Sequence, residues 1–521
     1  MPTPSLPPSP PASSPRRVFA ATVPLPLHDA ASTRHIEAAA LARSSPHALM
    51  ARAGLATARL ALAVAPHARR IAVLAGPGNN GGDGLIAALH LRQRGLDVCV
   101  VQRFDPHRLP ADAADAWQQA SSAGLPMTAD LSALADADLL IDGLLGLGAS
   151  RAPAGPLAEA IAAATASGRP ILAIDLPSGL SADRGAVLGE QAVRARWTLS
   201  LLTLKPGLFT AAGRDHAGEV WLDDLGVSTA DPCAWLGAWG AAPAPGFEPR
   251  RHAQHKGSFG DLFVVGGAPG MQGAAWLAAR AALTAGAGRV YLSTLGPDVA
   301  IPALPELMQR HQVWQADAAT LGRATVVCGC GGGKEVIAAL PALLAHAGRL
   351  LLDADALNAV ARDPALLAQL AARGADGRPA VLTPHPLEAA RLLGCSAAEV
   401  QADRLGAATR LAEIAAAVVL LKGSGTVITA RGRAPWINAS GNAALAAPGS
   451  GDVLAGWIGG LWARQPAAPA EAEAEAAWFA ARAGAWLHGH AADRHWGARA
   501  GQGHLPLRAG DLIDTMAASL D

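Results

Sequence analysis

The segment GPGNNGGDG (76–84) has residue types and spacing that suggest ligand chemistry. It follows the short apolar run IAVLAG (71–76) and precedes a helix-compatible segment, so glycine amides and a helix N-terminus would face an anionic ligand. It matches neither the G-x-G-x-x-G fingerprint nor a Walker A loop, which disfavours a generic dinucleotide or nucleoside triphosphate site. A plain strand-to-helix turn would not need this composition, and we interpret the segment as part of a binding site.

Two aspartates extend this candidate site. Asp142 and Asp175 each end an apolar segment, and Ser178 follows the second of them. A lone aspartate at a strand end is more often a helix cap or turn residue than a catalyst. Two of them, converging with the glycine-rich segment on one sheet edge, favour a site. The oxygen atoms of Asn80, Asp142 and Ser178 could also hold a hard cation.

In the C-terminal half, GSGDVLAG (449–456) is the most informative motif. A glycine pair at a helix N-terminus supplies amides for a transferring phosphoryl group, and Asp452 beside it can accept a hydroxyl proton. The simpler alternative for Asp452 is a first-turn acid stabilised by the helix dipole. The G-S-G-D context favours the functional interpretation.

Two further motifs precede that segment. TPHPLE (383–388) places His385 and Glu388 one helical turn apart at a strand end, where a lone histidine is usually a hydrogen-bonded turn residue. In LKGSGT (421–426), Lys422 is suited to a nucleotide phosphate, and a solvated hairpin charge is the alternative.

The elements that must position these residues follow a simple pattern. Strand-like and helix-like segments alternate from about residue 30 to 225, and a second alternation begins at DLFVVGG (261–267). This pattern is typical of parallel sheets covered by helices on both faces. Residues 228–256, rich in Ala, Pro, Gly and Trp, interrupt it and predict a linker. Both halves are therefore predicted to be α/β.

Composition excludes several classes of protein. The 521 residues are 51% hydrophobic, which is enough for large cores, and 42 basic residues balance 42 acidic ones. A chain without net charge produces no electrostatic field that would attract nucleic acid or an anionic membrane. No apolar run reaches the roughly 18 residues that a membrane span needs. The five scattered cysteines include the C-x-C pair Cys328 and Cys330, with no second pair to complete a zinc site. We expect no disulfide framework, a reducing compartment and a cytoplasmic protein.

Lysine is rare in this chain. Only 4 of the 42 basic residues are lysine, so a lysine marks a place that needs a compact ammonium on a flexible stem. These lysines are Lys205 in TLKPG, Lys256 in HKGSFG, Lys334 in CGCGGGK and Lys422 in LKGSG. The scarcity favours a functional Lys422 and suggests a flap role for Lys256 over a ligand. For Lys205 a structural role is slightly preferred to a contact with phosphate.

Together, GPGNNGGDG, the two strand-end aspartates with their flanking residues, and TLKPG resemble the YjeF N-terminal family of NAD(P)H-hydrate epimerases over residues 25–230. The resemblance implies a Rossmann-like doubly wound sheet and inversion of C6 of the hydrated nicotinamide ring. It implies a potassium ion at Asn80, Asp142 and Ser178, and proton transfer by Asp175. The implied substrate contacts are Asn79, Asn80, Gly81, Gly82, Asp83, Gly146, Leu147, Gly148, Ala149, Ser150, Arg151, Ala152 and Asp175.

TPHPLE, LKGSGT and GSGDVLAG resemble the YjeF C-terminal family of ADP- or ATP-dependent NAD(P)H-hydrate dehydratases, of ribokinase-like fold, over residues 253–521. The resemblance implies phosphorylation of the C6 hydroxyl with Asp452 as base and Mg²⁺ on the nucleotide phosphates, followed by elimination of phosphate. The implied hydrate contacts are Ala274, Gly331, His385 and Asp452, and the implied nucleotide contacts are Lys422, Gly423, Ser424, Gly425, Thr426 and Gly451. The family usually has proline where this chain has Cys330.

We therefore predict a bifunctional enzyme that repairs hydrated NADH and NADPH, uses ADP, releases AMP and phosphate, and forms a homo-oligomer. Residues 1–24 are predicted to be a disordered tail and residues 231–252 a linker. One alternative is a ribokinase-like kinase of a small alcohol fused to a Rossmann-like ligand-binding domain. Another is a scaffold role for the N-terminal half, as in mRNA decapping, although neutral charge and few aromatic residues argue against RNA.

Overall fold

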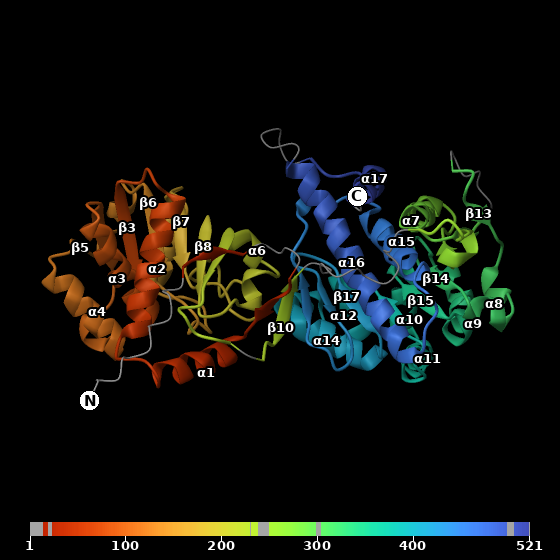
Figure 1. Ribbon diagram of the computed structural model, residues 1–521, viewed down its shortest axis with the longest axis horizontal. Helices are drawn as coiled ribbons and strands as arrows, with labels where there is room; N and C mark the ends of the chain where they lie inside the picture. The colour runs from red at the N-terminus through yellow and green to blue at the C-terminus, as the bar shows by residue number, and fades with distance from the viewer. Residues whose placement is uncertain are drawn as a thin grey trace, which may run out of the picture. The chain divides into compact units, whose positions relative to one another are not determined.

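The computed structural model describes residues 14–18, 23–229, 231–237, 250–297, 304–497 and 505–519. The chain divides into two compact units that meet in sequence at Ala234 and Trp235. Much of the predicted tail (1–24) and linker (231–252) lies outside the described residues, so these boundaries stay predictions. Both units combine strands with helices (Figure 1).

The first unit is built on a largely parallel sheet with the order β1-β9-β8-β7-β6-β3-β4-β5, in which only the β1–β9 pair is antiparallel. Its strands are β1 (Arg16–Arg17), β3 (Arg70–Ala75), β4 (Asp97–Gln102), β5 (Met127–Thr128), β6 (Leu139–Gly143), β7 (Ile171–Ile174), β8 (Trp197–Leu201) and β9 (Glu219–Asp223). Strand β2 (Leu25–Leu27) spans a sequence boundary between the units.

Helices cover both faces of this sheet, so the side chains of successive strand residues pack into two different cores. In β3, Ile71 and Val73 belong to one apolar cluster, whereas Ala72 and Leu74 belong to the other. The α-helices are α1 (Ala30–Leu41), α2 (Ala48–Val64), α3 (Asn79–Gln93), α4 (Ala111–Ser122), α5 (Pro156–Ala166) and α6 (Gly213–His216). Three short 3₁₀ helices are η1 (Pro106–Arg108), η2 (Leu131–Leu134) and η3 (Pro206–Leu208).

The strand order of the first unit reverses at β3. The chain runs from β3 outward to β4 and β5, then returns to β6 on the other side of β3 and continues to β9. In an open α/β sheet, ligands bind outside the carboxyl ends of the strands at such a switch point. The segments that follow β3, β6 and β7 are therefore the ones expected to form a site.

The second unit contains a larger mixed sheet. From β13 to β10 its order is β13-β12-β11-β14-β15-β16-β17-β18-β19-β10, and β18 pairs antiparallel with both neighbours. The strands are β10 (Ala234–Gly237), β11 (Asp261–Gly266), β12 (Arg289–Thr294), β13 (Met308–Gln309), β14 (Thr325–Cys328), β15 (Arg349–Leu352), β16 (Ala380–Leu382), β17 (Val418–Leu421), β18 (Val427–Thr429) and β19 (Trp436–Asn438). Here the order reverses at β11, next to β14.

Two apolar cores again lie on opposite faces. One core joins the strands to α7, α15, α16 and α17, and the other joins them to helices from α9 to α14. The helices are α7 (Gln272–Thr284), α8 (Ala318–Gly322), α9 (Leu340–His346), α10 (Ala354–Arg362), α11 (Pro364–Ala375), α12 (Pro386–Leu393), α13 (Ala397–Ala402), α14 (Arg404–Ala415), α15 (Ser450–Ala463), α16 (Ala470–Gly497) and α17 (Ala509–Ala517). The 3₁₀ helices are η4 (Lys256–Phe259), η5 (Val313–Gln315), η6 (Glu335–Ala338) and η7 (Ala443–Leu445).

The predicted α/β class is confirmed for both units. The apolar segments predicted to end at Asp142 and Asp175 form β6, which stops at Gly143, and β7, which stops at Ile174. The residues that follow these strands leave the sheet and form loops at its carboxyl edge. Among the described residues, no helix combines the length and apolar character needed to cross a membrane.

Candidate active sites

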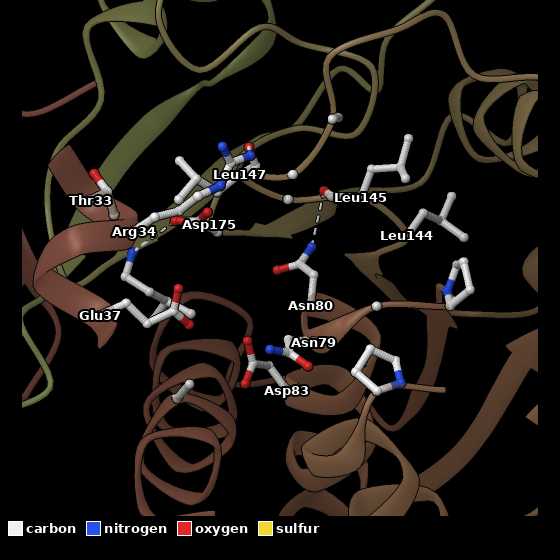
Figure 2. Close-up of a pocket in the computed structure, with 18 of the residues that line it drawn as sticks. Thr33, Arg34, Glu37, Asn79, Asn80, Asp83, Leu144, Leu145, Leu147 and Asp175 are labelled. Carbon is white, nitrogen blue, oxygen red and sulfur yellow. Dashed lines mark hydrogen bonds between the residues drawn. The ribbon is translucent and has the colours of Figure 1, made fainter. Parts of the chain in front are cut away.

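A cavity of about 910 Å³ opens at the carboxyl ends of β3, β6 and β7 (Figure 2). Its lining includes most of the residues predicted to contact the epimerase substrate: Asn79, Asn80, Asp83, Gly146, Leu147, Gly148, Ala149, Ser150, Arg151, Ala152 and Asp175. Gly81 and Gly82 are buried in the first turn of α3 and do not line the cavity. The structure thus brings the predicted segments together at one switch point.

The glycines of the first loop are required by close packing. A Cβ atom on Gly81 would lie 2.0 Å from the carbonyl oxygen of Gly76. A Cβ atom on Gly76 would itself lie 1.8 Å from the carbonyl oxygen of Leu144, which follows β6. These contacts hold the start of α3 against the end of β3 and the loop after β6.

Asp175 and Lys205 form a buried ion pair in the cavity wall. The ammonium of Lys205 donates to Oδ1 of Asp175 and to the carbonyl oxygen of Leu201, the latter at 2.7 Å. Only 1% of the Lys205 side chain is exposed. Asp175 has φ of 64°, a conformation that non-glycine residues adopt rarely and that clusters at functional sites. Lys205 therefore lines the candidate site and also holds Asp175 in place. The choice between a structural role and a contact with phosphate stays a prediction.

Two more acids face the same cavity. Burial and the charge of Asp175 raise the pKa of Glu37, which comes from α1. Burial and the carboxylates of Asp175 and Glu37 raise the pKa of Asp83 well above its usual value. Figure 2 shows Glu37, Asp83 and Asp175 around the cavity. Sequence reasoning missed Glu37, because an acid in the helix IEAAA carries no local signal of a site.

The three predicted potassium ligands are linked through the loop after β6. Ser178 donates from Oγ to Oδ1 of Asp142 at 2.6 Å and from its amide to Oδ2 at 2.8 Å. The Leu145 amide donates to Ser178 Oγ at 2.8 Å, and Asn80 Nδ2 donates to the Leu145 carbonyl at 3.0 Å (Figure 2). Asp142 is fully buried, and burial raises its pKa to about 6.

A second group of side chains gathers at the strand ends of the second unit. Cys330 follows β14, Asp353 follows β15, and Asp452 lies in the first turn of α15. Their ligand atoms all lie within 4.8 Å of one another. Helix α15 starts at Ser450 after Gly449, whose φ of 82° favours glycine. The free amides of the first turn of α15 therefore lie at the same helix end as Asp452.

Lys422 completes this cluster from the end of β17. Its ammonium donates to Oδ1 of Asp353 at 2.7 Å, and Oγ1 of Thr383 donates to the same oxygen at 2.8 Å. Burial lowers the pKa of Lys422, but the carboxylates of Asp353 and Glu388 outweigh this effect and raise it. Burial and the charge of Asp353 raise the pKa of Asp452 to about 6. Sequence reasoning predicted Lys422 and Asp452 but overlooked Asp353.

His385 is the N-cap of α12 and forms a capping box with Glu388. Its Nδ1 accepts from the Leu387 amide at 3.1 Å, and Glu388 Oε2 accepts from the His385 amide at 2.7 Å. Burial raises the pKa of Glu388 to about 7, whereas burial and Lys422 lower the pKa of His385. A hydrogen-bonded turn residue was the simpler expectation for His385, and this geometry accounts for its local role.

The other predicted hydrate contacts are neighbours. A Cβ atom on Gly331 would lie 2.9 Å from the Cβ of Ala274, which is in the first turn of α7. Gly331 directly follows Cys330 in the sequence. Because glycine has no side chain, only its backbone borders the cluster of Cys330, Asp353 and Asp452. Ala274 and Gly331 therefore meet beside the strand end that carries Cys330.

The loop between β17 and β18 contains the predicted nucleotide contacts Lys422, Gly423, Ser424, Gly425 and Thr426. Arg404, which is 1% exposed, organises this loop from α14. Its guanidinium donates to the carbonyl oxygens of Leu421 and Lys422 at 3.2 and 3.1 Å. Burial lowers the pKa of Arg404 to about 10, so the group stays charged at neutral pH. Sequence reasoning did not find this residue.

Some candidates lie elsewhere. Lys256 and Lys334 are exposed, and η4 with Lys256 precedes the amino end of β11, opposite to the strand ends that carry the cluster. The position of Lys256 in this chain therefore gives no support to the suggested flap, which stays a prediction. Cys328 and Cys330 belong to different apolar cores. His488 is buried with Nε2 3.1 Å from Ser450 Oγ, and His490 stacks on Trp486.

The fold and the two strand-end clusters define a two-unit α/β protein with one candidate ligand site in each unit. Residues 46–207 match the model of the YjeF-related protein N-terminus, and residues 262–513 match that of NAD(P)H-hydrate dehydratase. The chain belongs to the family of bifunctional NAD(P)H-hydrate repair enzymes.

Relatives over nearly the whole length support this assignment. The bifunctional NAD(P)H-hydrate repair enzyme Nnr of Escherichia coli is 37% identical, with 88% of this chain and 87% of the relative covered. Its counterpart in Gloeobacter violaceus is 39% identical, with 88% and 93% covered. The ADP/ATP-dependent NAD(P)H-hydrate dehydratase of Bacillus subtilis, solved with ATP/Mg²⁺, is 27% identical over 53% of this chain and 95% of that chain. Its TM-score is 0.42, so the assignment rests on the sequence relatives.

Proposed function

We propose that the first unit epimerises the hydrates of NADH and NADPH and that the second unit dehydrates the S form with ADP. The observation that carries the proposal is the same in both units: an ammonium and a carboxylate meet at the carboxyl ends of the strands. In the first unit they are Lys205 and Asp175, and in the second they are Lys422 and the Asp353–Asp452 cluster. Such pairs can bind an anionic nucleotide and move a proton.

In the proposed epimerase site, Asp175 exchanges a proton with the C6 carbinol of the hydrate. The Lys205 ammonium fixes the position of the Asp175 carboxylate by donating to its Oδ1. Glu37 and Asp83, whose pKa values are raised by burial and by the charge of Asp175, line the same cavity. The loop 146–152 and the first turn of α3 hold the rest of the dinucleotide.

The residues proposed for K⁺ fit an oxygen-only cation site. Asp142 is a buried carboxyl whose raised pKa reflects missing solvation, and a bound cation would supply the missing positive charge. Ser178 adds a neutral oxygen beside it, and Asn80, which carries an amide oxygen, is bonded to the same loop through the Leu145 carbonyl. When bound there, K⁺ would stabilise the loop after β6 that lines the cavity.

In the proposed dehydratase site, Asp452 accepts the proton of the C6 hydroxyl while that oxygen attacks the terminal phosphoryl group of ADP. AMP leaves, and loss of phosphate with a ring proton restores the nicotinamide. The amides at the start of α15 and the Lys422 ammonium stabilise the transferring phosphoryl group. Mg²⁺ would neutralise charge on the nucleotide phosphates, together with Lys422.

The test uses the full-length protein and purified (R)-hydrate of NADPH with ADP, Mg²⁺ and K⁺. Recovery of NADPH absorbance requires both activities, whereas the (S)-hydrate requires only the dehydratase. Asp175→Asn should block recovery from the R form but not from the S form. Asp452→Asn should leave R–S interconversion intact, which chromatography of the two hydrates measures. The same variant should block recovery of NADPH from both the R and the S form.

Two results would overturn the proposal. Absence of NADPH with either ADP or ATP would exclude the dehydratase. Accumulation of a stable phosphoester in stoichiometric amounts would indicate a small-alcohol kinase instead. Replacing K⁺ by tetramethylammonium at constant ionic strength should slow epimerisation only, and an unchanged rate would contradict the cation site at Asp142.

A further inference from the structure

Asp353 is a buried carboxylate to which the proposed reaction assigns no step. It follows β15, between the ends of β14 and β16, and is 2% exposed. Its amide donates to the carbonyl oxygen of Cys328 at 3.0 Å, which fixes its backbone to the neighbouring strand. A charge in such a place is expensive unless it is paired, so its partners show what it does.

Both partners of Asp353 bind the same oxygen atom. Oδ1 accepts from Lys422 Nζ at 2.7 Å and from Thr383 Oγ1 at 2.8 Å. The three residues follow the adjacent strands β15, β16 and β17, so the sheet itself sets the geometry. The flexible lysine stem is thereby held with its ammonium near the start of α15, where a Cβ atom on Gly451 would lie 3.4 Å from Nζ.

We propose that Asp353 is a positioning residue of the dehydratase site, which anchors the Lys422 ammonium for the nucleotide phosphates and keeps Asp452 basic by its negative charge. The inference rests on the proposed function of the second unit. Asp353 touches neither nucleotide nor hydrate in this scheme and acts through Lys422 and Asp452.

The second half of the proposal follows from the charges around Asp452. Asp353 and Cys330 face it from the ends of β15 and β14, and Lys422 faces it from β17. Asp353 raises the pKa of Asp452, whereas the Cys330 thiol and the Lys422 ammonium lower it. Glu388 on α12 and His488 on α16 lie in the field of Lys422, and His488 bonds to Ser450 in the same turn as Asp452. The negative charge of Asp353 is therefore the neighbouring group that favours proton acceptance.

Three variants separate the two roles. Asp353→Asn keeps an oxygen that can accept from Lys422 but removes the charge, so the acid limb of the kcat–pH profile should move down by roughly one pH unit while the KM for ADP changes little. Asp353→Ala releases Lys422 as well, and binding of ADP should weaken at least about tenfold. Thr383→Val removes a neutral hydrogen bond to the same oxygen and should shift neither quantity.

Affinity for ADP is measured by calorimetry on each folded variant, because this readout needs no turnover. Equal ADP affinity in wild type, Asp353→Asn and Asp353→Ala would overturn the anchoring role. An acid limb that stays at the wild-type pH in Asp353→Asn, as it should in Thr383→Val, would overturn the electrostatic role. Failure of wild-type protein to dehydrate the (S)-hydrate would instead overturn the proposed function, so the two failures are distinguishable.

Discussion

Lys205 Nζ and Asp175 Oδ1 are bonded to each other at the end of β7, with the lysine side chain almost completely enclosed and the aspartate in a left-handed conformation. The pair is both a structural element and the centre of the proposed epimerase. These two roles predict different responses to mutation, because stability depends on charge balance whereas proton transfer depends on the groups themselves.

Lys205→Met should lower stability by about 3–5 kcal/mol, because it leaves the Asp175 carboxylate buried without its partner. Epimerisation should fall by about 100-fold or more. The double variant Lys205→Met/Asp175→Asn removes both charges and should recover most of the stability but none of the epimerase activity. Denaturant unfolding and R–S interconversion measure the two quantities. Recovery of activity in the double variant would show that the pair is only structural.

The dehydratase should lose activity as the pH falls through about 6, because burial and Asp353 raise the pKa of Asp452 to that value and the base must be deprotonated. Above that pH the rate should reach a plateau. The measurement is the kcat for (S)-hydrate between about pH 5 and 8, with saturating ADP. Asp452→Asn should remove the activity across the range, and a profile that rises toward acid would contradict this role.

Arg404→Met should weaken the nucleotide loop, because the guanidinium bonds the carbonyl oxygens of Leu421 and Lys422. We expect a stability loss of about 1–3 kcal/mol and a higher KM for ADP. Arg410→Met is the matched control, since Arg410 is exposed on the same helix. Equal KM values in both variants would mean that the loop does not depend on Arg404.

Gly81→Ala should destabilise the first unit by about 1–3 kcal/mol and reduce epimerisation, because the new Cβ would lie 2.0 Å from the Gly76 carbonyl oxygen. Gly78→Ala serves as the stability control, since a Cβ at Gly78 meets no atom within 4 Å. Thermal unfolding of both variants should separate them. Equal stability would show that the start of α3 can shift without cost.

The sequence was sufficient for the α/β class and for much of each site, because strand-end position is a local property. Asp142 and Asp175 were found by that rule; Asp175 lines the cavity of the first unit, and Asp142 is buried and bonded to the Leu144 amide and Ser178. Asp353 occupies the same kind of position after β15 and was available to the same reasoning. Its importance is visible only once β17 brings Lys422 to it, a contact across 69 residues of sequence.

Other site residues had no such signal. Glu37 lies in an ordinary alanine-rich helix, and only the packing of α1 directs it to the cavity. The lysine scarcity drew attention to four residues: Lys205 and Lys422 lie in the candidate sites, whereas Lys256 and Lys334 are exposed. A compositional filter selects residue types, but it does not distinguish a strand end from the opposite edge of the sheet.

The enclosure of Cys330 has a consequence for chemical damage. Burial and the carboxylates of Asp452 and Asp353 raise the pKa of this thiol well above its usual value. Electrophiles and peroxides react with thiolates, so a cysteine beside Asp452, the proposed dehydratase base, is kept in its inert form. We expect iodoacetamide at neutral pH to label Cys330 last and to spare dehydration, as followed by mass spectrometry and NADPH recovery. Early labelling with loss of activity would show instead that this strand end is an oxidation-sensitive point of the enzyme.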